Sequence, residues 1–123
     1  MPSIIITSGK QKGRFCRLGQ TTNVIGRDEN LPIQILDDTI SRRHLQILFD
    51  HRTWLYAAED MGSRNGVLIN GQKIEKETVL NDGDIIKIGD TQLMFTNKDF
   101  FDRKSTLDHI RRIGQENRPT KTD

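Results

Sequence analysis

The feature that most constrains the fold of this chain is a succession of short apolar runs, each ended by a turn signal. Such runs lie at residues 4–6, 14–18, 23–25, 33–36, 45–49, 54–57, 67–69, 84–88 and 92–95. Residues 45–49 alternate between apolar and polar, which is typical of a strand with one buried face. Turn dipeptides such as Gly89-Asp90 separate the runs. Many short strands with frequent turns predict an all-β sandwich or barrel.

Size and composition limit the chain to a modest globular unit. It has 123 residues, 33% of them hydrophobic and 29% charged, which suits one domain with one core. No apolar run approaches the ~20 residues that a membrane-spanning helix needs. The first seven residues do not form a secretion signal, and the single Cys16 allows no internal disulfide. We therefore expect a cytoplasmic protein that does not associate with membranes.

The charge is distributed unevenly along the chain. Basic and acidic residues are equal in number within residues 1–97, so the net charge of +2 belongs to residues 98–123. A protein that binds nucleic acid through a broad surface normally carries a basic stripe. Trp54 and Tyr56, the aromatic residues best suited to stacking on bases, are expected in a core strand. Nucleic acid is therefore an unlikely partner, and any anion site must be local.

The usual signatures of an enzyme are missing. The sequence contains neither a G-x-S-x-G nucleophile motif nor a G-x-x-x-x-G-K-[ST] phosphate loop. His44, His51 and His109 lack metal-ligand spacing, and one cysteine cannot build a structural zinc site. The adjacent carboxylates Asp37 and Asp38 are typical of a solvated turn. We expect no catalysis, no cofactor and no bound metal.

Three loops stand out by their content. Gly26-Arg27 follows a strand, Ser41-Arg42-Arg43-His44 precedes one, and Gly62-Ser63-Arg64-Asn65-Gly66 precedes another. In a sandwich, loops at one end of the sheets gather in space although they are far apart in sequence. These loops offer guanidinium groups, hydroxyls and an amide, which together suit an oxyanion such as a phosphate monoester. Arginine, unlike lysine, binds such groups through two parallel hydrogen bonds.

In this order and spacing, the three loops, with Asn70-Gly71 after them, resemble the signature of the forkhead-associated (FHA) domain. The resemblance covers roughly residues 3–97. It implies a β-sandwich of about eleven short strands with a binding site on loops at one end. It also implies recognition of a phosphothreonine-containing protein or peptide in Ser/Thr kinase signalling, with threonine preferred over serine.

The resemblance also assigns roles by position. Arg27 would grip the phosphate, Ser41 would donate a hydrogen bond to it, and Arg42 would face it. Asn65 would fix the main chain of the ligand and help to wall a slot for the threonine methyl group. Support of the site by tight turns or loop-tying hydrogen bonds would fall to Gly26, His44, Gly66 and Gly71.

Arg64 departs from the pattern, because many family members have threonine at this position. The guanidinium of Arg64 would add a second charge at the phosphate, or reach the third residue after the phosphothreonine and favour an acidic one there. The sequence leaves both possibilities open. The departure also keeps an alternative open, in which the domain has the same fold and binds proteins without any need for phosphate.

The character of the sequence changes after Asn97, so we divide the chain into a binding domain at 1–97 and a tail at 98–123. Within the tail, Ser105 as N-cap and Gly114 as terminator predict a short helix. Residues 115–123 contain no apolar side chain and are expected to be disordered or part of a linker. Phosphorylation of Thr106 or Thr120 would allow the tail to bind its own domain or a second copy, giving self-association.

Overall fold

The computed structural model describes residues 1–97, which form an all-β unit of eleven strands. The strands are β1 (Ser3–Ile6), β2 (Phe15–Arg17), β3 (Asn23–Gly26), β4 (Ile33–Gln34), β5 (Leu45–Asp50), β6 (Leu55–Asp60), β7 (Val67–Ile69), β8 (Gln72–Lys73), β9 (Thr78–Val79), β10 (Ile85–Ile88) and β11 (Thr91–Thr96). The predicted all-β class and the strand number of about eleven are confirmed. The predicted helix at 105–114, the disordered end and the threonines of the tail lie outside the described residues.

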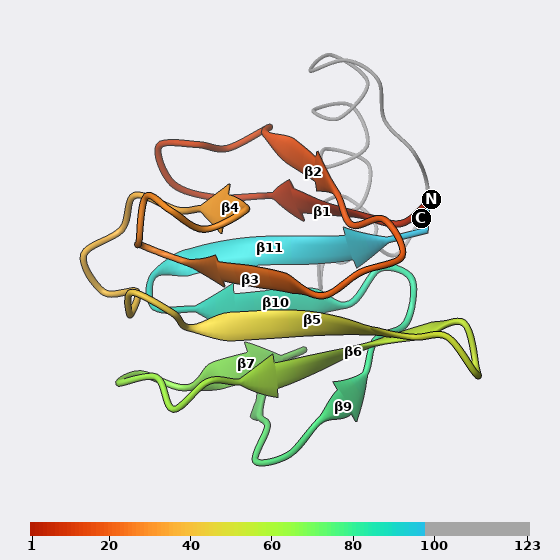
Figure 1. Cartoon of the computed structure of the whole chain (residues 1–123). Coiled ribbons are helices and arrows are strands. Elements are labelled where there is room, and N and C mark those ends of the chain that lie inside the picture. Colours follow the sequence, from red (N-terminus) through yellow and green to blue (C-terminus); the bar gives the residue numbers. More distant parts are fainter. Residues whose placement is uncertain (98–123) are drawn as a thin grey trace, which may run out of the picture.

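The strands form two sheets that pack face to face (Figure 1). One sheet has six strands in the order β2-β1-β11-β10-β7-β8, and the other has five in the order β4-β3-β5-β6-β9. All pairings are antiparallel except that of β3 with β4. Hairpins connect β1 to β2, β5 to β6, β7 to β8 and β10 to β11, whereas most other connections cross from one sheet to the other.

The core lies between the two sheets and is built from the alternating apolar residues. Ile4 and Ile6 point inward from β1, as do Ile86 and Ile88 from β10, and all four are fully buried. Ile47 and Ala58 face them from the five-stranded sheet. A smaller cluster of Ile5, Met94, Phe15 and Ile85 lies apart from this core, because alternate residues of a strand point to opposite faces. The core holds the strands rigidly and so fixes the positions of the loops.

The structure corrects the expectation for the residues that follow β5. Trp54 was expected to begin a core strand, but it lies in the β5–β6 turn and its side chain is 64% exposed. Its φ of 62° is in the left-handed region, which bulky residues rarely adopt. Tyr56 is buried in β6 as expected. The sequence also missed β8 and β9, because strands of two residues are too short to show alternation.

Candidate functional site

The register of the sheets brings the three arginine-bearing loops to one end of the sandwich, which we call the loop end. Ile25 near the end of β3 pairs with Leu45 at the start of β5, and Leu45 pairs with Asp60 at the end of β6. The β3–β4 loop (residues 27–32), the β4–β5 loop (35–44) and the β6–β7 loop (61–66) are therefore neighbours. They lie together on the left of Figure 1.

Arg27 is fixed by its neighbours yet presents its charge to solvent. Its backbone N–H donates to the Ser41 carbonyl at 3.1 Å, and its Nε donates to the Ile40 carbonyl at 3.0 Å. Within residues 1–97, no carboxylate lies within ion-pair distance of Arg27. The two terminal guanidinium nitrogens thus remain available, and the Nε bond sets the direction in which they point.

The Ser41 side chain connects the β4–β5 loop to the β6–β7 loop. Its Oγ accepts a hydrogen bond from the backbone N–H of Arg64 at 3.0 Å, which leaves the hydroxyl hydrogen free to donate to a ligand. Its own N–H donates to Nδ1 of His44 at 3.1 Å. The hydroxyl is therefore oriented before any ligand arrives.

Arg42 is the one site arginine with an ion pair among the described residues. Its guanidinium lies 3.3 Å from Oδ2 of Asp28, and its side chain is 74% exposed. A backbone hydrogen bond from Asn30 lowers the pKa of Asp28; burial opposes this, and the charge of Arg42 lowers the pKa further. Water screens this pair because the Arg42 side chain is largely exposed, so the attraction is weak. A phosphate dianion can therefore compete with Asp28 for Arg42.

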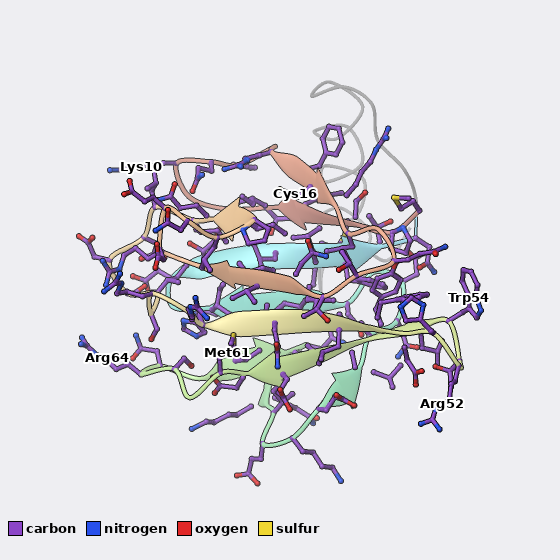
Figure 2. The ribbon with its side chains drawn as sticks, in the orientation of Figure 1. Lys10, Cys16, Arg52, Trp54, Met61 and Arg64 are labelled. Carbon is purple, nitrogen blue, oxygen red and sulfur yellow. The ribbon has the colours of Figure 1, made fainter. Side chains whose placement is uncertain are left out.

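Asn65 and Arg64 lie side by side at the tip of the β6–β7 loop and differ in how firmly they are held. The Asn65 amide donates from Nδ2 to the Thr39 carbonyl at 2.8 Å. The Arg64 guanidinium makes no hydrogen bond or ion pair within residues 1–97. Figure 2 shows it extending outward from the loop end. Asn65 is thus preset, whereas Arg64 is free to follow a ligand.

His44 is fully buried and joins the β4–β5 loop to the β6–β7 loop. Its Nδ1 accepts from Ser41 N–H, and its Nε2 lies 2.6 Å from the Gly66 carbonyl oxygen. A carbonyl oxygen can only accept, so Nε2 carries the proton and the ring is the neutral Nε2–H tautomer. This one ring satisfies a donor and an acceptor on two different loops.

Two of the glycines predicted to support the site are required by the backbone around them. A Cβ at Gly26 would overlap the Arg42 carbonyl, so this position must be glycine for the β3–β4 and β4–β5 loops to touch. Gly66 has a φ of 78°, and its N–H is bound by Ser63 Oγ at 3.0 Å. Gly71 lies in the β7–β8 turn, at the opposite end of β7 from Gly66, and is not among the gathered residues.

The sequence analysis missed a clamp that holds the β4–β5 loop in place. Asp37, expected to be a solvated residue, is partly buried and accepts four hydrogen bonds. They come from Thr39 N at 2.9 Å, Thr39 Oγ1 at 2.6 Å, Thr91 Oγ1 at 2.7 Å and Asp90 N at 3.2 Å. Burial raises the pKa of Asp37, but these hydrogen bonds outweigh it and hold the pKa below its ordinary value. The local Asp-x-Thr spacing is a turn signal, whereas the contact with β11 spans more than fifty residues and leaves no sequence trace.

Residues 39–41 are therefore the hub of the site. Their carbonyl groups hold Asn65 and Arg27, and the Ser41 hydroxyl holds the Arg64 backbone. The arrangement presents guanidinium, hydroxyl and amide groups on a preset backbone, which can bind a tetrahedral oxyanion on an extended peptide.

Comparison with known proteins decides the family. The family model for the FHA domain matches residues 23–89, which is more than half of the chain. This chain belongs to the FHA domain family. The FHA match includes all three arginine-bearing loops.

Individual FHA relatives agree with this assignment. The chain is 33% identical over 92 residues to the FHA domain-containing protein FhaA of Mycobacterium tuberculosis, covering 75% of this chain and 17% of FhaA. It is 34% identical over 94 residues to an oxoglutarate dehydrogenase inhibitor of Corynebacterium jeikeium, covering 76% and 63%. It spans less than two thirds of the length of these curated relatives.

A solved structure from a study of phosphothreonine-dependent FHA domain interactions superposes on the chain with a TM-score of 0.70. The two are 27% identical, and the match covers 80% of this chain and 98% of that one. The FHA domain is a binding module rather than a catalytic one. No helix among residues 1–97 has the length and apolar character needed to cross a bilayer.

Proposed function

We propose that this FHA domain is a phosphothreonine-dependent binding module that acts as an adaptor in Ser/Thr kinase signalling. The observation that carries the proposal is the hub at residues 39–41, which holds Arg27, Ser41 and Asn65 ready on three loops. The phosphothreonine dependence of the solved FHA relative supports the same reading. The partner is a phosphothreonine-containing protein or peptide.

Each of these side chains has a part in binding that fits its geometry. The terminal nitrogens of Arg27 bind the phosphate, because its Nε is already occupied by the Ile40 carbonyl. Ser41 donates its free hydroxyl hydrogen to the phosphate. The Arg42 guanidinium leaves its ion pair with Asp28 and binds the phosphate instead. The donors are held before binding, so little conformational entropy is lost when the ligand arrives.

Asn65 accounts for the main-chain contact and for the choice of threonine. One Nδ2 hydrogen binds the Thr39 carbonyl, so the second hydrogen and Oδ1 remain to bind the peptide main chain of the ligand. A threonine methyl group buried beside it contributes about 1 kcal/mol over serine. We assign a supporting role to Gly26, His44, Gly66 and Gly71, of which the first three make the loop contacts described above and Gly71 lies in the β7–β8 turn.

The proposal also covers catalysis, the cellular location and the tail of the chain. The module has no catalytic activity of its own and acts in the cytoplasm. The division into a domain at 1–97 and a tail at 98–123 stays a prediction. So does self-association through phosphorylated Thr106 or Thr120, which predicts that a phosphorylated tail peptide competes with other ligands.

The test begins with a degenerate phosphothreonine peptide library, from which one binding peptide is selected. That peptide is then titrated calorimetrically in its phosphothreonine, phosphoserine and unphosphorylated forms. We expect micromolar affinity, about −8 kcal/mol, for the phosphothreonine form alone. Arg27→Ala removes charge-assisted hydrogen bonds worth about 1.5–3 kcal/mol each and should reduce binding below detection. Arg52→Ala, an exposed arginine in the β5–β6 turn, is the matched control and should bind like the original protein.

The outcomes separate the two candidate functions. Equal binding of phosphorylated and unphosphorylated peptide would favour the alternative, a phosphate-independent interaction domain of the same fold. Unchanged affinity in Arg27→Ala would refute the assignment of the phosphate to the loop end.

A further inference from the structure

A cavity of about 650 Å³ is lined by Arg27. Arg27 also belongs to the three-loop site. Ser41, Arg64 and Asn65 do not line the cavity. Its other walls come from the β1–β2 loop, with Lys10 and Gln11, and from Leu36 and Asp90. The volume falls within the range of sites that bind small molecules or side chains. A ligand bound at Arg27 can therefore extend into this cavity.

The β1–β2 loop carries only positive charge, and its Lys10 lines the cavity. Residues 7–14 include Lys10, Lys12 and Arg14 and no acidic residue. Lys10 and Lys12 are exposed, and neither forms an ion pair in the described part of the chain. Figure 2 shows both Lys10 and Arg64 at the loop end, with Lys10 near the top of the view and Arg64 lower down. The positive charge of the loop end thus extends beyond the three loops that carry the family pattern.

The position of the β1–β2 loop is fixed relative to Arg27. The Gln11 side chain donates from Nε2 to the Gln34 carbonyl at 3.3 Å and accepts from Leu36 N–H at 2.8 Å. The Gln34 side chain in turn donates to the Arg27 carbonyl at 3.1 Å. These bonds form a continuous connection from the loop to the phosphate-binding arginine, so the two positive regions keep a set separation.

Acidic residues that also line the cavity restrict where an anion can lie. Asp38 and Asp90 are exposed carboxylates of the lining, and Asp37 is occupied by its four hydrogen bonds. An anionic group in the middle of the cavity would be repelled by these carboxylates. It would be attracted to Lys10 on the β1–β2 loop, which lines this cavity and also an adjoining hollow that Lys12 and Arg14 line.

We propose that Lys10 and Lys12 form a second subsite, which binds an anionic side chain of the same phosphothreonine partner. The anionic side chain lies on the side of the phosphothreonine that points away from Asn65. The subsite accepts a carboxylate or a second phosphate, since both are anionic oxygen acceptors. The proposal rests on the proposed function and names the class of partner: a phosphothreonine segment with an acidic or second phosphorylated residue on one flank.

The test compares phosphothreonine peptides whose flanks differ. One has three glutamates before the phosphothreonine, one has three after it, one has neutral flanks and one has lysine flanks; a fifth replaces the glutamates by a single phosphoserine. The measured quantity is the ratio of affinities for flanked and neutral peptides, taken on the same protein at low salt. A variant that folds poorly or weakens the phosphate site changes both affinities and leaves this ratio unaffected.

We expect one of the two glutamate flanks to improve binding by about fivefold. In Lys10→Glu/Lys12→Glu that improvement should disappear, and the lysine-flanked peptide should become the tighter ligand. Arg52→Glu/Lys76→Glu makes the same change of net charge at exposed positions that do not line the cavity, and should leave the ratios as they were. Improvement by the phosphoserine flank beyond that of glutamate would identify a second phosphate as the preferred group.

The subsite is refuted if the neutral phosphothreonine peptide binds but Lys10→Glu/Lys12→Glu leaves every ratio unchanged. In that case the proposed function stands and only the second subsite fails. If no phosphothreonine peptide binds at all, both fail together. A change of ratio in the Arg52→Glu/Lys76→Glu control as large as in the Lys10→Glu/Lys12→Glu variant would also refute it, because the effect would then come from net charge alone.

Discussion

The two ends of the sandwich are stabilised in different ways. At the loop end, side chains such as Arg27 and Asn65 are held by backbone carbonyl groups and keep their remaining polar atoms exposed. At the opposite end, which we call the turn end, aromatic packing adds to the local hydrogen bonds that close the β5–β6 turn, such as that from Trp54 N–H to the Asp50 carbonyl at 2.8 Å. Phe49 contacts His51, Trp54 and Tyr56 with ring centroids 4.8, 5.5 and 5.0 Å apart. Figure 2 shows Trp54 and Arg52 at this end, across the molecule from Arg64.

The difference explains which end can bind an anion. Hydrogen bonds between loops leave directed donors unused, and such donors bind a phosphate without reorganisation. Aromatic contacts use the ring surfaces and hold no donor in a set direction. Substitutions at the loop end should therefore change binding along with stability, whereas substitutions at the turn end should change stability alone.

The largest effect on stability and binding is expected when His44 at the loop end is compared with His51 at the turn end. His44→Ala removes a buried ring that satisfies Ser41 N–H and the Gly66 carbonyl. It should lower the free energy of unfolding by about 3 kcal/mol, through lost packing and unsatisfied polar groups. The folded fraction should also bind phosphothreonine peptide at least tenfold more weakly, because Ser41 loses its anchor. Urea denaturation followed by circular dichroism, and titration at low temperature, measure the two effects.

His51→Ala is the control at the turn end, where the ring is exposed and contacts Phe49 edge-on. We expect it to cost less than about 1 kcal/mol and to leave peptide affinity unchanged. A loss of binding in His51→Ala as large as in His44→Ala would break the comparison between the two ends.

The same comparison separates what the sequence could predict from what it could not. Apolar runs between turn signals identified the longer strands, and the grouping of loops at one end of a sandwich predicted that the loops of Arg27, Ser41 and Asn65 would lie together. The Asp37 clamp escaped prediction because its partners, Asp90 and Thr91, are far away in sequence and are brought close only by the finished sandwich. The cavity beside Lys10 was missed for the same reason.

The turn end was harder to predict, because there tertiary contacts override local preference. Turns with a left-handed residue usually have glycine or asparagine at that position, so a tryptophan gives no turn signal. The edge-on contact of Trp54 with Phe49 accompanies this unusual backbone. An apolar residue next to β6 was therefore mistaken for the first residue of the strand.

A second, smaller effect concerns the Asp37 clamp. Asp37→Asn replaces a charged acceptor of four hydrogen bonds and should cost about 2 kcal/mol at pH 7. Phosphothreonine affinity should fall as well, because Thr39 carries the carbonyl that holds Asn65. Asp38→Asn is the matched control, since this exposed neighbour takes no part in the clamp.

The pH dependence of stability sharpens this prediction. The pKa of Asp37 is below its ordinary value in the folded protein, because the hydrogen bonds to its carboxylate outweigh burial. Its stabilisation is therefore fully present above the unfolded pKa of about 3.9 and is lost as the pH falls through the folded pKa. The difference in unfolding free energy between the original protein and Asp37→Asn should shrink between pH 5 and pH 2, about the range over which such a carboxylate becomes protonated. A difference that stays constant over this range would show that the charge of Asp37 contributes nothing.

The smallest expected effect is the free-energy cost of the left-handed backbone conformation at Trp54, in the turn end. Trp54→Gly and Trp54→Ala both remove the ring and its contact with Phe49, so their difference reports the cost of a φ of 62° for a residue with a Cβ. We expect the glycine variant to be more stable by about 1 kcal/mol, against the usual advantage of alanine. At Thr53, where φ is negative, the order of the same two substitutions should reverse. Peptide affinity should be unchanged in all four variants, because no residue of this turn contacts the loop end. A weakened affinity in either Trp54 variant would mean that the two ends are coupled through β5 and β6, and the separation argued from their different stabilisation would be wrong.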